Sequence, residues 1–402
     1  MNSIKPFCAI RSNPTITNKF CTNTITSYTK KEIKNILKSN SKTFLHIIRE
    51  NIDLDKNLSP NDRLKKINSE FKRFKKEGFI IKDKIPGLYI NEITTDLEKI
   101  TGVIGVVPIY NYNNGKIKKH ENTIRSREKT FKNYLKITRF NAEPVLLSYK
   151  IQDSLKSLIE RLKNQKPTSE TKFSKQEICK LWHVKNKFEI LNLIKEFNKI
   201  PKFYIADGHH RSESSKLLHD EEKSSKTDAF MAFLVPENEI KIKEYNRIIT
   251  DLNDHSPISF IEKLKLKFHV KKIEKYQTEK KENGFHMYFN GQFYLLSLIK
   301  KNNHTFSPLN KLEAYILQEH ILKPILGIKN IRNDKRITYS YKSDKMESIK
   351  NQIDDGKFAV GFGLKAVTID ELKNVADADL VMPPKTSFIY PKLRSGITIF
   401  EF

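Results

Sequence analysis

The sequence predicts an α+β protein rather than an evenly wound α/β protein. Helical spacing of apolar residues and short strand-like runs of Val, Ile, Phe and Tyr both occur along the whole chain, but they follow one another irregularly. No fixed-period repeat and no Pro-rich or Gly/Ser-rich tract interrupts the pattern. A chain of 402 residues therefore has room for one large domain or two of ordinary size.

The first 150 residues contain three predicted helices and four predicted strands. Residues 59–78 carry the clearest end signals, with Ser59 as an N-cap, Pro60 at the first helical position and Gly78 beyond the end. Apolar spacing also predicts helices at residues 28–40 and 124–136, and apolar runs predict strands at residues 43–48, 87–93, 100–109 and 143–149.

The middle of the chain combines regular elements with a less regular stretch. Helices are predicted at residues 151–163 and 185–198, and the residues between them lack a clear period. Beyond these come a strand at 202–206, a helix that starts at Ser212 and extends to 222, and strands at 229–235 and 239–249.

A cluster of Asn, Asp, Ser and Pro at residues 253–257 predicts a domain boundary, with regions 1–252 and 253–402. After it, helices are predicted at 258–267, 311–322, 345–354 and 369–374, and strands at 268–273, 285–289, 292–298 and 358–364.

The net charge of +27 raises the question of a nucleic-acid partner. Only 13 of the 74 basic residues are arginine, whereas proteins that bind the phosphates or the grooves of nucleic acids favour arginine. The lysines are spread along the chain beside abundant Asn and Ile, which favours genome composition as their origin. We therefore do not expect a nucleic-acid partner, although the charge would attract a phosphorylated small molecule.

The sequence predicts a cytoplasmic protein with no membrane partner. No window approaches the 18 uninterrupted apolar residues of a membrane span, and the N-terminus lacks the pattern of a secretory signal. Cys8, Cys21 and Cys179 lack metal-ligand spacing and are typical of reduced thiols. The oligomeric state does not follow from these patterns.

The segment "FYIADGHHRSESS", residues 203–215, is the strongest candidate for a functional site. Gly208 permits a tight turn from the strand, and the start of the following helix would suit an anion. Arg211 can bind phosphate or carboxylate with two parallel hydrogen bonds, and His209 and His210 can transfer protons near neutral pH. Asp207 can orient a histidine or hold Mg²⁺. The alternative is a helix start with an exposed pair of histidines.

The segment "KKHENT", residues 118–123, is a second candidate. His120 could contact a phosphate or substrate. Glu121 lies among lysines, which would keep its carboxylate ionised and available as a general base.

Two further segments contain cations that could clamp a phosphate or carboxylate. "MPPKTSFIYPKLRSG", residues 382–396, carries Lys385, Lys392 and Arg394 after a stiff Pro-Pro pair, and "EYNRII", residues 244–249, carries Asn246 and Arg247. The first of these segments could equally be a proline-braced closing segment of the fold.

These four segments, in this order, resemble a widespread bacterial and archaeal family of unknown function. "KPFCAIR", "TFLHIIRE", "TGVIGVV" and "HILKPILGI" also fit its pattern. The chain departs from the family at "NKFCTNTITSY" and at Ser12, where the family has other residues, so a role for this N-terminal loop is not implied.

The DGHHR element resembles that of archaeal free-serine kinases and the phosphate-binding box of the ParB/sulfiredoxin superfamily. This resemblance implies a ParB/sulfiredoxin-like mixed core in residues 1–252 and an additional α+β region in residues 253–402. It also implies phosphoryl transfer in serine biosynthesis, as a serine kinase or a phosphoserine phosphatase, with Glu121 as the base and the DGHHR turn holding phosphate. We then expect serine, phosphoserine or a similar small phosphorylated metabolite as the substrate and Mg²⁺ as the metal. ATP, ADP and the absence of any nucleotide all stay open.

Two alternatives remain open. One is a ParB-like nucleotide-binding switch, or a nucleic-acid-binding protein, without small-molecule turnover; a recognisable helix-turn-helix is not present. The other is a structural or regulatory protein in which DGHHR only starts a helix.

Overall fold

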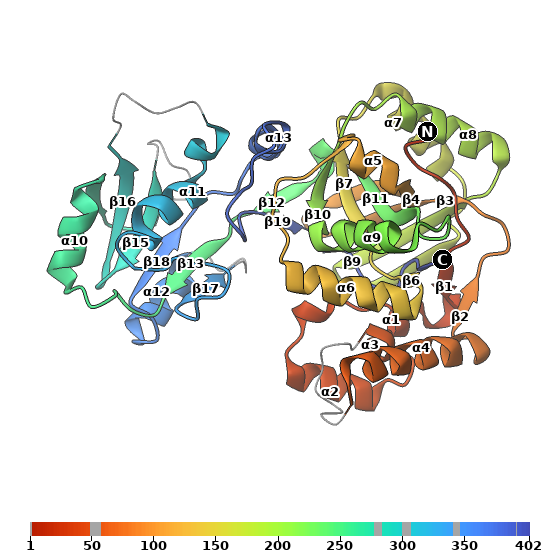
Figure 1. The fold of residues 1–402 in the computed structure, drawn as a ribbon, viewed down its shortest axis with the longest axis horizontal. Helices are drawn as coiled ribbons and strands as arrows, with labels where there is room; N and C mark the ends of the chain where they lie inside the picture. Colours follow the sequence, from red (N-terminus) through yellow and green to blue (C-terminus); the bar gives the residue numbers. More distant parts are fainter. Residues whose placement is uncertain (1, 49–57, 277–283, 300–306, 341–345, 391) are drawn as a thin grey trace. The chain divides into compact units, whose positions relative to one another are not determined.

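The structure is a computed structural model that describes residues 2–48, 58–276, 284–299, 307–340, 346–390 and 392–402. The chain forms two compact units (Figure 1). The first unit contains residues 1–119, 123–240 and 391–402, and the second contains residues 120–122 and 241–390. Each unit combines helices with its own sheet, so the α+β class is confirmed. The units divide at 240/241, whereas the boundary at 252/253 stays a prediction about folding domains.

The first unit is built on an eight-stranded mixed sheet. Its strands are, in spatial order, β5 (Ile117–Lys118), β10 (Phe203–Asp207), β7 (Val145–Tyr149), β11 (Ala229–Pro236), β4 (Lys99–Pro108), β3 (Leu88–Thr95), β9 (Glu177–Val184) and β8 (Ser169–Ser174). Strand β10 pairs parallel with β5 and antiparallel with β7. The carboxyl ends of β5 and β10 therefore lie at the same edge of the sheet as the start of β7.

Apolar side chains of this sheet form a large core with two helices, α7 (Asp153–Lys163) and α8 (Lys187–Asn198). A third helix, α9 (His209–Glu222), packs against β7 and β11, and α6 (Arg125–Thr138) lies along α9 (Figure 1). A separate core joins α1 (Thr17–Phe20), α3 (Leu45–Ile48) and α4 (Pro60–Lys76) to the short strands β1 (Ile10–Ser12), β2 (Ile80–Lys82) and β6 (Phe140–Asn141). Strand β20 (Phe400–Glu401) pairs with β6, and the unit also contains α2 (Lys30–Ser39) and α5 (Ile109–Asn113).

The second unit is built on a six-stranded antiparallel sheet. Its order is β14 (Phe268–Ile273), β16 (Gln292–Leu298), β15 (Phe285–Phe289), β18 (Val360–Gly363), β13 (Asn246–Ile249) and β17 (Ile337–Ser340). The main core packs this sheet against α10 (Pro257–Lys265), α11 (Glu313–Leu317) and the π-helical turn Gln318–Leu322, and a smaller core packs it against α12 (Met346–Asp354). The unit also contains α13 (Ile369–Asp377) and a ribbon in which β12 (Lys241–Lys243) pairs with β19 (Phe388–Tyr390).

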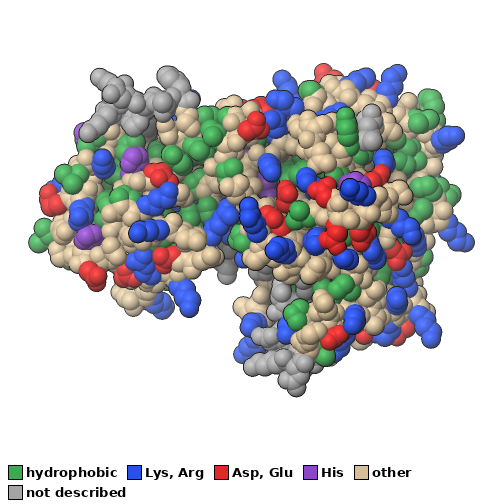
Figure 2. All heavy atoms as spheres, viewed as in Figure 1, with side chains coloured by type: hydrophobic (Ala, Val, Ile, Leu, Met, Phe, Trp, Pro, Cys, Tyr) green, Lys and Arg blue, Asp and Glu red, His purple; other side chains and the backbone are tan. Residues whose placement is uncertain are grey.

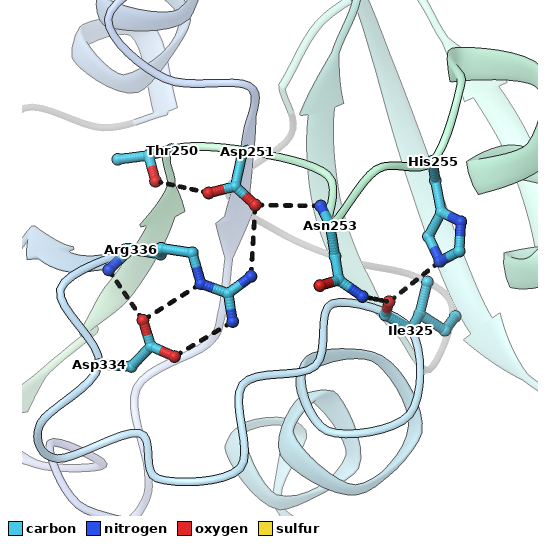
Figure 3. Close-up of polar contacts among 7 residues, drawn as sticks. All are labelled: Thr250, Asp251, Asn253, His255, Ile325, Asp334 and Arg336. Carbon is cyan, nitrogen blue, oxygen red and sulfur yellow. Dashed lines mark hydrogen bonds and ion pairs between the residues drawn. The ribbon is translucent and has the colours of Figure 1, made fainter.

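The polar segment around residue 253 lies inside the second unit (Figure 3). Asn253 Nδ2 donates to Ile325 O at 3.3 Å, and His255 Nε2 lies 3.1 Å from the same oxygen. Arg336 donates to Asp251 at 3.3 Å. The turn-forming residues 253–256 therefore lie in the loop between β13 and α10.

Most predicted elements are present, and the exceptions have a common cause. Residues 43–48 were predicted as a strand, but Leu45–Ile48 form helix α3. The stretch without a clear period contains the hairpin of β8 and β9. The strand predicted at 239–249 is divided into β12 and β13, and the helix predicted at 311–322 contains a π-helical turn. In each case packing against distant residues overrides a short local pattern.

Basic side chains lie over many elements on the face of each unit drawn in Figure 2, with acidic side chains between them. Within the described parts of the chain, no helix combines the length and apolar character that a membrane crossing requires.

Candidate functional site

The predicted turn lies at the edge where β10 ends. Asp207 is the last residue of β10, Gly208 has φ +102°, and α9 begins at His209. A Cβ atom at position 208 would lie 3.2 Å from Arg211 Nε and 3.3 Å from Val145 Cα. The positive φ and these close approaches together explain the glycine.

Helix α9 begins three residues before the start predicted at Ser212. Ser212 is not an N-cap; its Oγ donates to His209 O at 3.0 Å within the helix. The actual N-cap, Gly208, has no side chain to cap the helix. The two histidines and Arg211 consequently lie in the first turn of α9, where His209 is buried and His210 is half-buried.

Arg211 is held in place by the backbone and by Asp207. Its Nη1 donates to Pro144 O at 2.5 Å, and its Nη2 donates to Asp207 Oδ2 at 3.0 Å. Glu143 Oε2 lies 3.9 Å from Nη1. The guanidinium is therefore oriented at the edge of the sheet, between the end of β10 and the residues that precede β7.

The C-terminal segment supplies a second cation to the same carboxylate. Lys392 Nζ lies 3.8 Å from Asp207 Oδ2. Ser395 Oγ donates to Glu143, which fixes this segment beside Arg211. The structure thus brings together parts of the ADGHHR and PKLRSG segments within the first unit.

Arg394, predicted as part of an anion clamp, is engaged by the protein itself. Its Nε and Nη2 donate to the two carboxylate oxygens of Glu177 at 2.6 and 2.7 Å. Its guanidinium carbon lies 4.1 Å from the centre of the Phe173 ring. These contacts join the C-terminal segment to the hairpin of β8 and β9, and the clamp role of Arg394 stays a prediction.

The residues of the second unit form a different group. His120, Glu121 and Asn122 belong to this unit although Lys118 and Lys119 belong to the first. Met382 N donates to His120 O at 2.9 Å, so the KKHENT and MPPK segments meet here. Glu121 is half-buried.

The side chain of His120 is buried, and its role in binding phosphate or substrate stays a prediction. Its side chain is only 2% exposed, and burial lowers its pKa to about 4. The imidazole is therefore neutral near pH 7, because burial disfavours the charged form.

Asn246 and Arg247 begin strand β13 and are both buried. Asn246 Oδ1 accepts a hydrogen bond from Leu364 N at 3.0 Å, which joins β13 to the end of β18. Arg247 donates to Tyr245 O and, at 2.9 Å, to Lys385 O. The EYNRII and MPPK segments are therefore in contact as well.

The predicted site residues thus fall into two groups, one in each unit. The first unit holds Asp207, Gly208, His209, His210, Arg211, Lys392 and Arg394, and the second holds His120, Glu121, Asn246, Arg247 and Lys385.

The turn of the first unit does not fit a Mg²⁺ ion on Asp207. Arg211 and Lys392 both approach the same oxygen, Oδ2, and their charges would oppose a divalent cation there. Among the described residues, no three His, Cys, Asp or Glu side chains are grouped so that they could hold a metal ion. The geometry of the turn favours an anion.

Sequence reasoning missed three contact residues of these sites. Pro144 O and Glu143 contact Arg211 from a segment 67 residues earlier, and Glu177 binds Arg394 from 217 residues away. The acidic and proline residues of "AEP" before a predicted strand were a weak local signal, but only the strand order places them beside β10.

The chain belongs to the family described as "Protein of unknown function (DUF1015)", which matches residues 4–315. No curated protein matches. A free serine kinase mutant in complex with AMP is similar in structure, with 12% identity and a TM-score of 0.41, over 74% of this chain and 91% of that chain. A conserved hypothetical protein from Pyrococcus furiosus has 14% identity and a TM-score of 0.38, over 73% of this chain and 94% of that chain. SbnI with a C-terminal truncation, from Staphylococcus aureus, has 11% identity and a TM-score of 0.40, over 73% of this chain and 87% of that chain.

Proposed function

We propose that this protein is a phosphoryl-transfer enzyme that acts on serine or phosphoserine. The observation that carries the proposal is the turn at Gly208, where Arg211 and Lys392 meet at Asp207 beside the start of α9. Two cations and a helix start without a side-chain cap favour a phosphoryl group. The choice of serine rests on the resemblance of DGHHR to the serine kinases.

In this proposal the first unit binds the phosphoryl group. Arg211 is pre-oriented because its Nη1 is fixed by Pro144 O, so little side-chain freedom is lost when an anion binds. Asp207 keeps Arg211 and Lys392 together in the absence of substrate, and a bound phosphate would share both cations with it. Phosphoryl transfer depends mainly on such positioning and neutralisation of charge.

Glu121 is proposed as the general base. In the kinase direction it would accept the proton of the serine hydroxyl as that oxygen attacks the terminal phosphoryl group of ATP or ADP. The bond from this phosphorus to the bridging oxygen breaks, so phosphoserine forms and ADP or AMP leaves. In the phosphatase direction it would accept a proton from the water that attacks phosphoserine, which releases serine and phosphate. His210, half-buried in the first turn of α9, is proposed to contact the phosphoryl group, and His209 to support the turn from its buried position.

The same proposal includes a ParB/sulfiredoxin-like core, a nucleotide as the phosphate donor, and a role in serine biosynthesis.

The test is a direct assay of the purified full-length chain. Serine with ATP or ADP and Mg²⁺ is incubated in one reaction and phosphoserine in another, and serine, phosphoserine and phosphate are measured. We expect turnover in one direction, and we expect it to be lost in the Arg211→Met variant. Binding of a nucleotide without turnover of either substrate would instead support the switch function, and the absence of both would remove the proposal.

A further inference from the structure

The turn around Lys385 in the second unit has an unusual backbone. Lys385 has φ +59°, a left-handed conformation that a residue with a Cβ atom adopts at a cost of about 1–2 kcal/mol. Such conformations persist only where the surrounding structure holds them, and they are concentrated at functional sites.

Several hydrogen bonds hold this turn. Arg247 Nη2 donates to Lys385 O at 2.9 Å. Thr386 Oγ1 donates to Pro383 O at 2.6 Å, and Met382 N donates to His120 O at 2.9 Å. The backbone on both sides of Lys385 is therefore fixed while its side chain is exposed.

Arg247 is an unusual residue to find behind such a turn. Its side chain is 3% exposed, its guanidinium bonds two backbone carbonyls, and it has no carboxylate partner among the described residues. Burial lowers its pKa to about 10, which still leaves it charged at neutral pH. A buried cation is costly unless an anion is near, so the positive charge here is incompletely balanced.

Lys385 adds a second positive charge on the exposed side of the turn. Its Nζ lies 5.7 Å from the centre of the Tyr245 ring, and it makes no ion pair with any residue that the structure describes. The charge of the exposed Lys385 ammonium group is thus carried on a backbone that hydrogen bonds hold in place.

We propose that Lys385 binds a small oxyanion, a carboxylate or a phosphate, and that Arg247 is the positioning residue that holds the Lys385 turn. The choice of amino-acid probes below rests on the proposed function.

The test measures binding to the full chain by calorimetry with three probes. L-serine carries a carboxylate without phosphate, phosphoethanolamine carries a phosphate without carboxylate, and phosphoserine carries both. We expect Lys385→Met to weaken phosphoserine binding by roughly 10–100-fold, the range for loss of a hydrogen bond to a charged group. The control is Lys357→Met, which removes one exposed lysine of the same unit that is paired with Asp355.

The probes separate the source of the oxyanion. A loss shared with L-serine identifies a carboxylate, and a loss shared with phosphoethanolamine identifies a phosphate. Unchanged affinity for all three probes in Lys385→Met, or no binding of any probe to the wild type at millimolar concentration, overturns the proposal. Equal binding of phosphoethanolamine to the wild type and to Arg211→Met would instead contradict phosphate binding at the Gly208 turn. The measurements on Lys385→Met would still test the Lys385 site.

The positioning role of Arg247 is tested by a double-mutant cycle. In an Arg247→Met background that unfolds at a temperature close to wild type, we expect Lys385→Met to have an effect of less than about threefold, because the turn is no longer held. Arg247→Lys retains the charge but not the planar fork, so it should behave like Arg247→Met. Additive effects, or full rescue by Arg247→Lys, would show that Arg247 does not position Lys385.

Discussion

The two units place their motif cations in different surroundings. In the first unit Arg211 and Lys392 approach Asp207, and Arg394 binds Glu177, so each cation has a carboxylate nearby. In the second unit Arg247 bonds backbone carbonyls, and Lys385 lies over an aromatic ring.

This difference predicts different binding behaviour. An anion at the Gly208 turn must share its cations with Asp207, so the gain on binding is partly offset by the weakened internal pair. An anion at Lys385 gains a cation that no described carboxylate neutralises. We therefore propose that the Gly208 turn orients an anion and that the Lys385 turn attracts one. The following predictions test this comparison, beginning with the largest expected effect.

Replacement of Glu121 should have the largest effect, if the second unit supplies the base as proposed. Glu121→Gln removes the group that accepts a proton but keeps its size, and loss of a general base lowers turnover by about 10²–10⁴-fold. Binding of phosphoserine should change little. Turnover under saturating substrate and the dissociation constant are the two measurements.

Glu262→Gln is the matched control for Glu121→Gln. Glu262 is an exposed carboxylate of the same unit, in α10, paired with Lys265. Full activity in Glu121→Gln would remove this residue from the mechanism, and equal losses in both variants would show an effect of net charge alone.

The buried His120 should make the second unit sensitive to acid. Its pKa of about 4 in the folded chain lies below the ordinary value of 6.5. Between these values the unfolded chain binds more protons than the folded chain, so stability is complete above about pH 6.5 and falls as the pH is lowered toward 4. The loss from this group amounts to about 3 kcal/mol by pH 4.

Urea unfolding between pH 7 and pH 4 measures this loss. His120→Gln should flatten the pH dependence relative to the wild type, whereas replacement of the exposed His269 by Gln should leave the curve parallel to the wild type. Parallel curves for His120→Gln and wild type would show that His120 is not the buried neutral group.

Local sequence predicted the centre of the first site but not its surroundings. An apolar strand, a glycine and a polar helix start are all visible in "FYIADGHHRSESS". The sequence predicts the helix start at Ser212, whereas the helix begins at His209 and its N-cap is Gly208, which has no side chain to indicate a cap. Three residues of shift decide whether Arg211 belongs to a loop or to the first turn of a helix.

The grouping of the motifs could not be predicted because it depends on distant contacts. Lys392 meets Asp207 across 185 positions, and Lys385, only seven residues before Lys392, belongs to the other unit. The burial of Arg247 could not be predicted from the sequence either, because arginine is mostly exposed in folded proteins. Sequence identified the residue types, and the strand order determined their partners.

Arg211 and Arg394 provide a direct comparison of two paired arginines. Arg211→Met should weaken binding of phosphoethanolamine by roughly 10-fold or more, because a charge-assisted bond is lost. Arg394→Met should lower the melting temperature through loss of the Glu177 pair and the Phe173 contact, with affinity unchanged. If Arg394→Met weakens binding as much as Arg211→Met, the clamp role predicted from the sequence is correct and the pairing with Glu177 is secondary.

The smallest effect concerns the backbone of the turn itself. Gly208→Ala places a Cβ atom at φ +102° and within 3.3 Å of Arg211 and Val145, whereas Gly115→Ala meets no atom within 4 Å at φ +77°. Strain alone costs about 1–2 kcal/mol at either position, so thermal unfolding should show a modest loss for both variants. Only Gly208→Ala displaces the guanidinium, and therefore only this variant should also weaken phosphate binding. Equal phosphate binding in the two variants would mean that the position of Arg211, fixed by Gly208 and Pro144, does not matter for the ligand. It would then contradict the proposal that the Gly208 turn orients an anion.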